Sequence, residues 1–122
     1  MAASLRSSIT EIGGILVTAH TLDADGEANV TGNSSGSIYL IDIDNTNNTV
    51  AVYLKMVDHA SNVGPGQVPT LVLRGTPGVV TSYVFESGFA YSAGVSISCT
   101  PDSSVAGNTD PANSVTVSLV AS

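Results

Sequence analysis

Short runs of alternating apolar and polar residues, separated by turn residues, constrain this chain more than any other feature of its sequence. The runs are rich in Val, Ile, Thr and Tyr, and a period of two places successive side chains on opposite faces of a β-strand. Many short strands between Gly, Pro and Asn turns predict an all-β fold, an antiparallel β-sandwich of jelly-roll type. We expect the strands within segments 12–20, 37–44, 49–57, 69–74, 79–86, 89–92, 94–100 and 114–121.

The strongest local prediction is a β-hairpin over residues 37–57. The NTNNT cluster at 45–49 is typical of a turn, because Asn tolerates positive φ and hydrogen-bonds to its own backbone. Lys55 marks its face of the second strand as the more solvated one. The side chains predicted to point inward are Tyr39, Ile41 and Ile43 in the first strand, and Val50, Val52, Leu54 and Met56 in the second.

The length of 122 residues predicts a single domain. We assign residues 1–15 to an N-terminal arm and residues 16–122 to one β-sandwich domain. Within the arm, Ser8 followed three residues later by Glu11 also matches a capping box, so a single helical turn over residues 4–12 is an equal alternative. No helix of normal length is predicted elsewhere.

The charge balance argues against two classes of partner. Three basic residues, Arg6, Lys55 and Arg74, stand against ten acidic ones, for a formal net charge of −7. Nucleic-acid binding needs several Lys or Arg to neutralise phosphates, and attraction to an anionic membrane needs the same. The chain also has no apolar run long enough for a membrane span or a secretory signal. We therefore expect a protein made in a cytoplasm that binds neither nucleic acid nor membrane.

A possible catalytic corner follows the strand AVYLKMV, where Asp58 and His59 precede Ser61. A nucleophilic triad needs Ser, His and an orienting carboxylate brought together from separate parts of a fold. Adjacent residues in a strand point to opposite sides, and the only other histidine is His20. We interpret the corner as the polar end of a strand and expect no enzymatic activity.

The DADGE stretch is the one candidate metal site. Asp23, Asp25 and Glu27 alternate as the first ligands of a calcium loop do, but Gly26 stands at position 4 rather than 6. Ser34 occupies the place of the bidentate Glu at position 12. An Asp-Gly turn is the favoured interpretation, and no cofactor is expected.

Cys99 is the only cysteine, so no intrachain disulfide is possible. It shares the predicted face of its strand with Val95 and Ile97. We expect a buried, unreactive thiol.

Residues 50–120 carry a resemblance to a known group of proteins. The matching segments are VAVYLKMVDHAS, VPTLVLRGTPG and VFESGFAYSAGVSISCT, then an acidic polar loop at 101–113 and a closing SVTVSLV. In this order they resemble small virion-associated proteins of tailed bacteriophages, which look like head decoration (cement) proteins. The resemblance implies a β-sandwich without catalytic residues that assembles as a homotrimer.

The resemblance also implies a role. The chain would bind the outer surface of the major capsid protein shell after synthesis in the host bacterial cytoplasm, and would stabilise the head. The alternative is a phage tail or appendage module that recognises a host surface glycan through exposed tyrosines, among Tyr39, Tyr53, Tyr83 and Tyr91. The residues expected at the capsid or subunit interface are Leu5, Arg6, Ile9, Ile12, Ile15, Asp58 and His59.

Overall fold

The computed structural model describes residues 3–9, 14–61, 66–105 and 107–122, which contain eight β-strands and no helix. Accordingly, no helix in this part of the chain could cross a membrane. The strands are β1 (Ala3–Ile9), β2 (Gly14–His20), β3 (Gly36–Asp44), β4 (Val52–Val57), β5 (Leu71–Gly75), β6 (Val80–Tyr91), β7 (Ser96–Thr100) and β8 (Thr116–Ala121).

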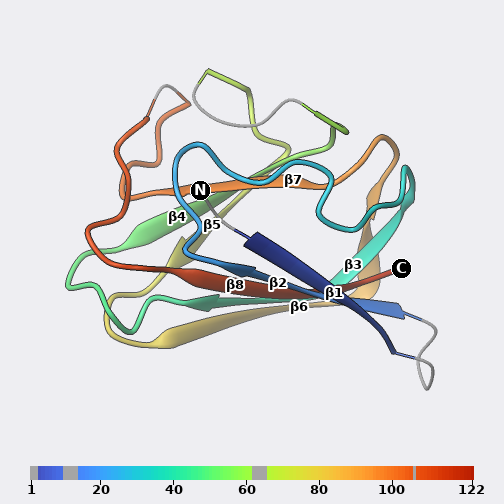
Figure 1. Ribbon diagram of the computed structural model, residues 1–122, viewed down its shortest axis with the longest axis horizontal. Helices are drawn as coiled ribbons and strands as arrows, with labels where there is room; N and C mark the ends of the chain where they lie inside the picture. Colours follow the sequence, from blue (N-terminus) through green and yellow to red (C-terminus); the bar gives the residue numbers. More distant parts are fainter. Residues whose placement is uncertain (1–2, 10–13, 62–65, 106) are drawn as a thin grey trace.

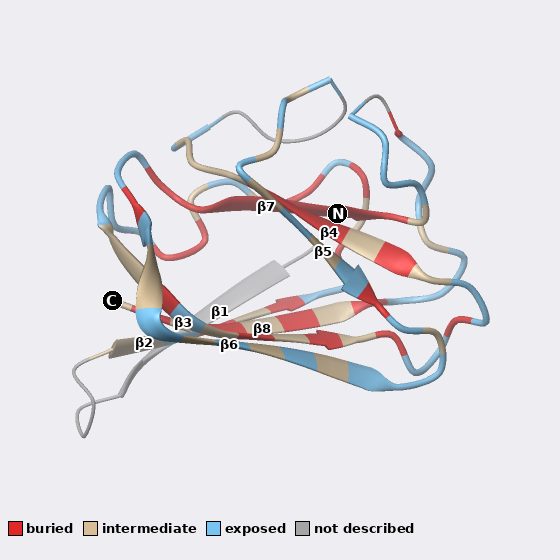
Figure 2. Ribbon diagram, turned by 180° about the vertical axis from the view of Figure 1, so that it is seen from behind, coloured by how far each residue is buried: buried red, intermediate tan, exposed pale blue. Residues whose placement is uncertain are grey.

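The strands form two antiparallel sheets that face each other (Figure 1). The larger sheet has the order β1-β2-β8-β3-β6, and the smaller sheet has the order β5-β4-β7. Figure 2 shows buried residues on both layers, with exposed residues concentrated in the loops and along β5 and β6. The all-β prediction with two antiparallel sheets is confirmed.

One hydrophobic core lies between the two sheets, because alternate residues of each strand point inward. The predicted inward residues Ile41, Ile43, Leu54 and Met56 are all at most 1% exposed. The core cluster also takes side chains from other strands, among them Val17, Ala19, Val52, Val95, Ile97, Cys99, Val117, Leu119 and Ala121.

The hairpin predicted over residues 37–57 is wrong, although both of its strands exist. β3 pairs with β6 and β8 in the larger sheet, whereas β4 pairs with β5 and β7 in the smaller one. The Asn-rich segment 45–51 therefore carries the chain from one sheet to the other. A cluster of turn residues reverses the chain in either case, so it does not reveal which strand becomes the partner.

Two buried asparagines hold this crossing in place. The Asn45 amide nitrogen donates to the carbonyl oxygens of Val50 (3.0 Å) and Gly75 (3.2 Å), while its oxygen accepts from the Asn48 amide nitrogen at 2.9 Å. Asn48 also donates to the carbonyl oxygen of Asn113 (3.0 Å) and accepts from its N–H (2.8 Å). The two amides thus join three chain segments that are distant in sequence.

A β-bulge in β3 corrects the predicted orientation of Tyr39. The strand register shifts between Ile38 and Leu40, so Ile38 joins Ile41 and Ile43 on the buried face. Tyr39 is 40% exposed instead of pointing inward. One extra residue changes the phase of the alternation, and the sequence pattern alone does not show where that happens.

Lys55 does not lie on a solvated face as predicted. It is only 5% exposed, and its Nζ donates to the carbonyl oxygen of Ser104 at 2.6 Å. The loop after β7 therefore covers this side of the smaller sheet. Val50, predicted to point inward, is instead exposed, because β4 begins at Val52.

The N-terminal arm predicted for residues 1–15 is not confirmed. Of these residues, Ala3–Ile9 form the edge strand β1, which pairs with β2 from Ala3↔His20 to Ile9↔Gly14, and residues 14 and 15 begin β2 itself. The alternative helical turn is wrong for residues 4–9. Pairing with β1 satisfies backbone groups along β2 that would otherwise lie at an open sheet edge.

The segment 22–30 follows β7 on the side away from β4. Glu27 and Ile97 exchange two backbone hydrogen bonds of 2.8 and 2.9 Å, and the Cys99 N–H donates to the Asp23 carbonyl oxygen at 2.9 Å. The bridge between Glu27 and Ile97 is antiparallel. This segment therefore covers one edge of the smaller sheet without forming a continuous strand.

We predict that Asn45→Ala lowers the free energy of unfolding by about 3 kcal/mol, because it leaves buried carbonyl groups and the Asn48 amide without partners. Chemical denaturation gives this value directly. The matched control is Asn47→Ala, which removes an exposed side chain and should change stability by no more than about 0.5 kcal/mol. Equal stabilities for the two variants would contradict the role given to Asn45.

Candidate functional site

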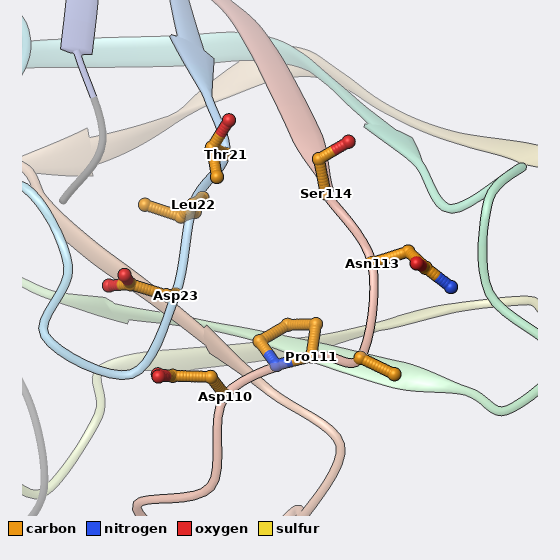
Figure 3. A pocket seen from close by; sticks show the side chains of 8 residues that line it. Thr21, Leu22, Asp23, Asp110, Pro111, Asn113 and Ser114 are labelled. Atoms are coloured by element: carbon orange, nitrogen blue, oxygen red, sulfur yellow. The ribbon is translucent and has the colours of Figure 1, made fainter.

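A surface hollow of about 240 Å³ lies between the segment after β2 and the loop before β8 (Figure 3). Asp23 comes from the segment after β2, and Asp110 comes from the loop before β8. Both polar and apolar groups line the rest of it. The lining residues are Thr21, Leu22, Asp23, Asp110, Pro111, Ala112, Asn113 and Ser114.

The carboxylates of this hollow hold the backbone of the neighbouring loop. Asp23 Oδ1 accepts the N–H groups of Asp25 (3.0 Å) and Gly26 (3.2 Å), as in an Asx turn. Asp110 Oδ1 accepts the N–H of Ala24 at 3.1 Å. Gly26 has φ of 72°, a value that glycine adopts without strain. The hollow is therefore bordered by a self-bonded turn.

Metal binding at DADGE finds no geometric support in the described part of the chain. Within it, no three or more His, Cys, Asp or Glu side chains form a group that could hold an ion. Asp23 bonds the turn, Asp25 is exposed, and Glu27 lies in the backbone bridge to Ile97. The three acidic residues therefore have different surroundings and do not converge on one point.

Asp58 joins the end of β4 to the loop between β6 and β7. Its carboxylate accepts the backbone N–H groups of Ser92 (3.0 Å), Ala93 (2.8 Å) and Gly94 (3.2 Å). Successive N–H groups that converge in this way form an anion-binding nest. A Cβ at Gly94 would lie 3.0 Å from the His59 carbonyl oxygen, so the close approach of the two segments favours glycine.

The pKa of Asp58 is lowered from its ordinary value. Burial raises the pKa, but the hydrogen bonds from Ala93, Ser92 and Gly94 together outweigh burial. These bonds stabilise the charged form of the carboxylate. Asp58 therefore stays ionised while it holds the loop.

His59 and Ser61 make a local contact at the same corner. The His59 Nδ1 accepts the N–H of Ser61 at 3.0 Å and lies 3.4 Å from the Ser61 Oγ. The His59 carbonyl oxygen accepts a hydrogen bond from the Ser96 Oγ at 2.6 Å. Asp58, in contrast, points to residues 92–94. The corner is therefore built from contacts that fix loops.

Of the expected interface residues, the structure describes the side chains of Ile15, Asp58 and His59. Leu5, Arg6 and Ile9 lie in β1, whose side chains are outside the described part, as is all of Ile12. Ile15 is partly buried and packs against the core. Asp58 and His59 follow β4 in the other sheet, where Asp58 bonds the loop at 92–94.

A surface that the sequence did not reveal lies on the outer face of the larger sheet. Leu16 is in register with Val120, Val120 with Leu40, and Leu40 with Val84. These four residues, here called the outer apolar row, cross the strands β2, β8, β3 and β6. The four residues are far apart in the sequence, and only the strand order and register line them up.

Comparisons with known proteins identify no relative of this chain. No protein-family model, no curated protein and no solved structure matches it. Any statement about function therefore rests on the geometry of the chain and on the resemblance of residues 50–120.

We predict that Asp58→Asn lowers the Tm at neutral pH and that this difference from wild type shrinks in acid. The folded-state pKa is below the unfolded one. The stabilisation is therefore complete above the unfolded-state pKa, about 3.9, and is lost as the pH falls through the folded-state value. Thermal unfolding followed by circular dichroism over a pH series tests this.

The control for this pH series is Asp25→Asn, which changes the net charge equally at an exposed position. Its Tm should stay close to that of wild type. A neutral-pH Tm for Asp58→Asn equal to that of the control would show that the 92–94 loop does not depend on the carboxylate.

We also predict that Cys99 does not react with a thiol reagent in the folded protein. Burial raises the pKa of its thiol to about 12; Lys55 lowers the value and Asp23 raises it, so the nucleophilic thiolate is scarce at neutral pH. An aromatic disulfide reagent should label Cys99 only after denaturant is added. Rapid labelling of the native protein would contradict the burial.

Proposed function

We propose that this chain is a non-enzymatic bacteriophage capsid decoration (cement) protein that binds the outer surface of the major capsid protein shell and stabilises the head. The observation that carries the proposal is the outer apolar row on the larger sheet. This row provides a surface that could contact the capsid, and the resemblance of residues 50–120 supports the same role. Location on the virion after synthesis in the host cytoplasm is part of the same proposal.

The outer apolar row suits a surface that meets another protein. In an antiparallel sheet with one face on the core, the other face is usually polar. Here Leu16 is 37% exposed and Val84 is 68% exposed at the two ends of the row. Exposed Tyr39 follows Ile38 at the bulge beside Leu40. An apolar row that crosses four strands gains free energy when a partner removes it from water.

A jelly-roll winding is part of the proposal and is supported by the strand order. If segment 22–30 is counted beside β7, the layers read β2-β8-β3-β6 and 22–30-β7-β4-β5. Each layer then alternates early and late strands, as two interlocked Greek keys do. β1 extends the larger layer at its edge. The homotrimer implied by the resemblance stays a prediction.

The alternative, a tail or appendage module for a host glycan, has less support in the geometry. It needs tyrosines gathered on one exposed surface. Tyr91 is buried and donates to the Ser122 carbonyl oxygen at 2.6 Å, and Tyr83 donates to that of Arg74 at 2.6 Å. Tyr39 and Tyr53 lie in different sheets. The tyrosines are thus divided between structural hydrogen bonds and separate faces.

We predict that Leu16→Glu weakens binding to heads assembled without this protein by roughly tenfold or more, since the change would place an unpaired carboxylate in the apolar contact, and its desolvation costs at least about 2 kcal/mol. Val72→Glu is the matched control, because Val72 is 39% exposed on the smaller sheet. Cosedimentation with heads measures both variants. Equal binding by the two would remove the outer apolar row from the proposal, and a wild-type protein that does not bind would overturn the proposal itself.

A further inference from the structure

We infer that two copies of this chain associate through the free edge of β6, by antiparallel pairing of residues 80–84 with the same residues of the second copy. The two-fold axis of this pair passes beside Ser82. Val84 belongs both to this edge and to the outer apolar row, but the inference does not depend on the function proposed above. A dimer through this edge is an alternative to the homotrimer that the resemblance implies.

Among the described strands, β6 has a partner on one side only. It is the last strand of the larger sheet and its one strand neighbour in the described residues is β3. In an antiparallel ladder each residue turns both its N–H and its C=O to the same side, and successive residues alternate sides. Half of the backbone groups of β6 therefore face away from the sheet.

The hydrogen bonds around β3 show which residues of β6 face outward. The Asn45 N–H donates to the carbonyl oxygen of Val79 at 3.1 Å, and the Asn45 carbonyl oxygen accepts from the Gly78 N–H at 3.0 Å, so Val79 turns its carbonyl group toward β3. Alternate residues of a strand bond to the same side, so Thr81 and Tyr83 also bond to β3. Val80, Ser82 and Val84 must then direct their N–H and C=O groups to the open edge.

The pairing of β3 with β8, its other neighbour, leads to the same assignment of the outward-facing residues of β6. The Ser122 N–H donates to the Ser37 carbonyl oxygen at 2.9 Å, which turns Ser37 toward β8. The bulge at Tyr39 shifts the alternation by one, so Leu40 and Asp42 also turn toward β8. Ile41, which lies between them, therefore turns toward β6 and bonds to Tyr83, in agreement with the assignment from Asn45 and Val79.

The outward residues form a sequence that reads the same in both directions, Val80-x-Ser82-x-Val84. In an antiparallel pair centred on Ser82, Val80 of one copy faces Val84 of the other, and Ser82 faces its own counterpart. The outward N–H and C=O groups of all three residues then find partners. Val80 and Val84 are 50% and 68% exposed, and each gains a cross-strand apolar contact.

This stretch also lacks the features that protect most sheet edges. Natural edge strands carry Lys, Pro or a bulge that prevents pairing with another chain. Residues 80–84 contain no charge and no proline. The irregularity comes later: Leu40 faces Val84 and Ile38 faces Phe89, so residues 85–88 lie opposite Tyr39 alone. The edge is therefore regular over the self-complementary stretch and irregular immediately after it.

A second copy is favoured over an unrelated strand because the valines and the central serine match themselves. Such a contact uses the same patch on both molecules, so it closes at two copies. The paired stretch is short, and small interfaces belong to weak or transient complexes. We therefore expect a reversible, concentration-dependent dimer.

The test uses the full chain in sedimentation velocity over a concentration series. Wild type should pass from monomer to dimer. Ser82→Lys and Ser82→Asp should each be monomeric at every concentration, because residue 82 meets the same charge across the axis. An equimolar mixture of the two variants should form a heterodimer, because the charges are then opposite.

The matched control is Ser118→Lys. Ser118 and Ser82 both pair with Asp42, one on each side, so the control lies on the same row but two strands from the edge. It should dimerise like wild type. If either variant at position 82 fails to fold, Val80→Asp and Val84→Lys replace the pair, since these positions face each other in the dimer.

Three results would overturn the inference. The first is a wild type that stays monomeric or forms trimers. The second is association that survives the charge changes at position 82, since another surface would then be responsible. The third is a mixture of the two charged variants that does not recombine, which would exclude a two-fold axis beside Ser82.

Discussion

The buried amide of Asn45 is the contact on which the arrangement of the two sheets depends. It lies where the chain leaves the larger sheet, and it also bonds Gly75, where the chain leaves β5 to return to that sheet. Through Asn48 it reaches Asn113, just before the last strand. Both amides find partners for their donors and acceptors, so their burial carries no unpaired group. Three loops are thus held at one end of the core.

Several charged side chains also hold loops in place through hydrogen bonds to the backbone. Asp58 holds the loop at 92–94, Asp110 and Asp23 hold the turn at 24–26, and Lys55 holds the loop that contains Ser104. Two surfaces of the described residues remain for partners in the proposals above, the outer apolar row and the edge of β6. This division agrees with a protein whose proposed role is to bind other proteins.

Much of the fold could be predicted from the sequence, because each strand carries its own alternation. The segments that became β3, β4, β7 and β8 were located closely, and Cys99 was correctly expected in the core. The errors over the hairpin and over Lys55 share one cause, which is that partner strands and covering loops come from distant sequence. Lys55 was expected in solvent because nothing near it shows that a loop after β7 covers it.

By itself, the sequence determined that this chain is all-β and which side chains within a regular strand share a face, since both follow from a local period of two. The tertiary structure decided which strands pair, where the bulge at Tyr39 changes the phase, and which apolar residues line up across four strands. The physical reason is that backbone hydrogen bonds between strands join residues far apart in the chain. Their register follows from the packing of the whole core rather than from any one segment.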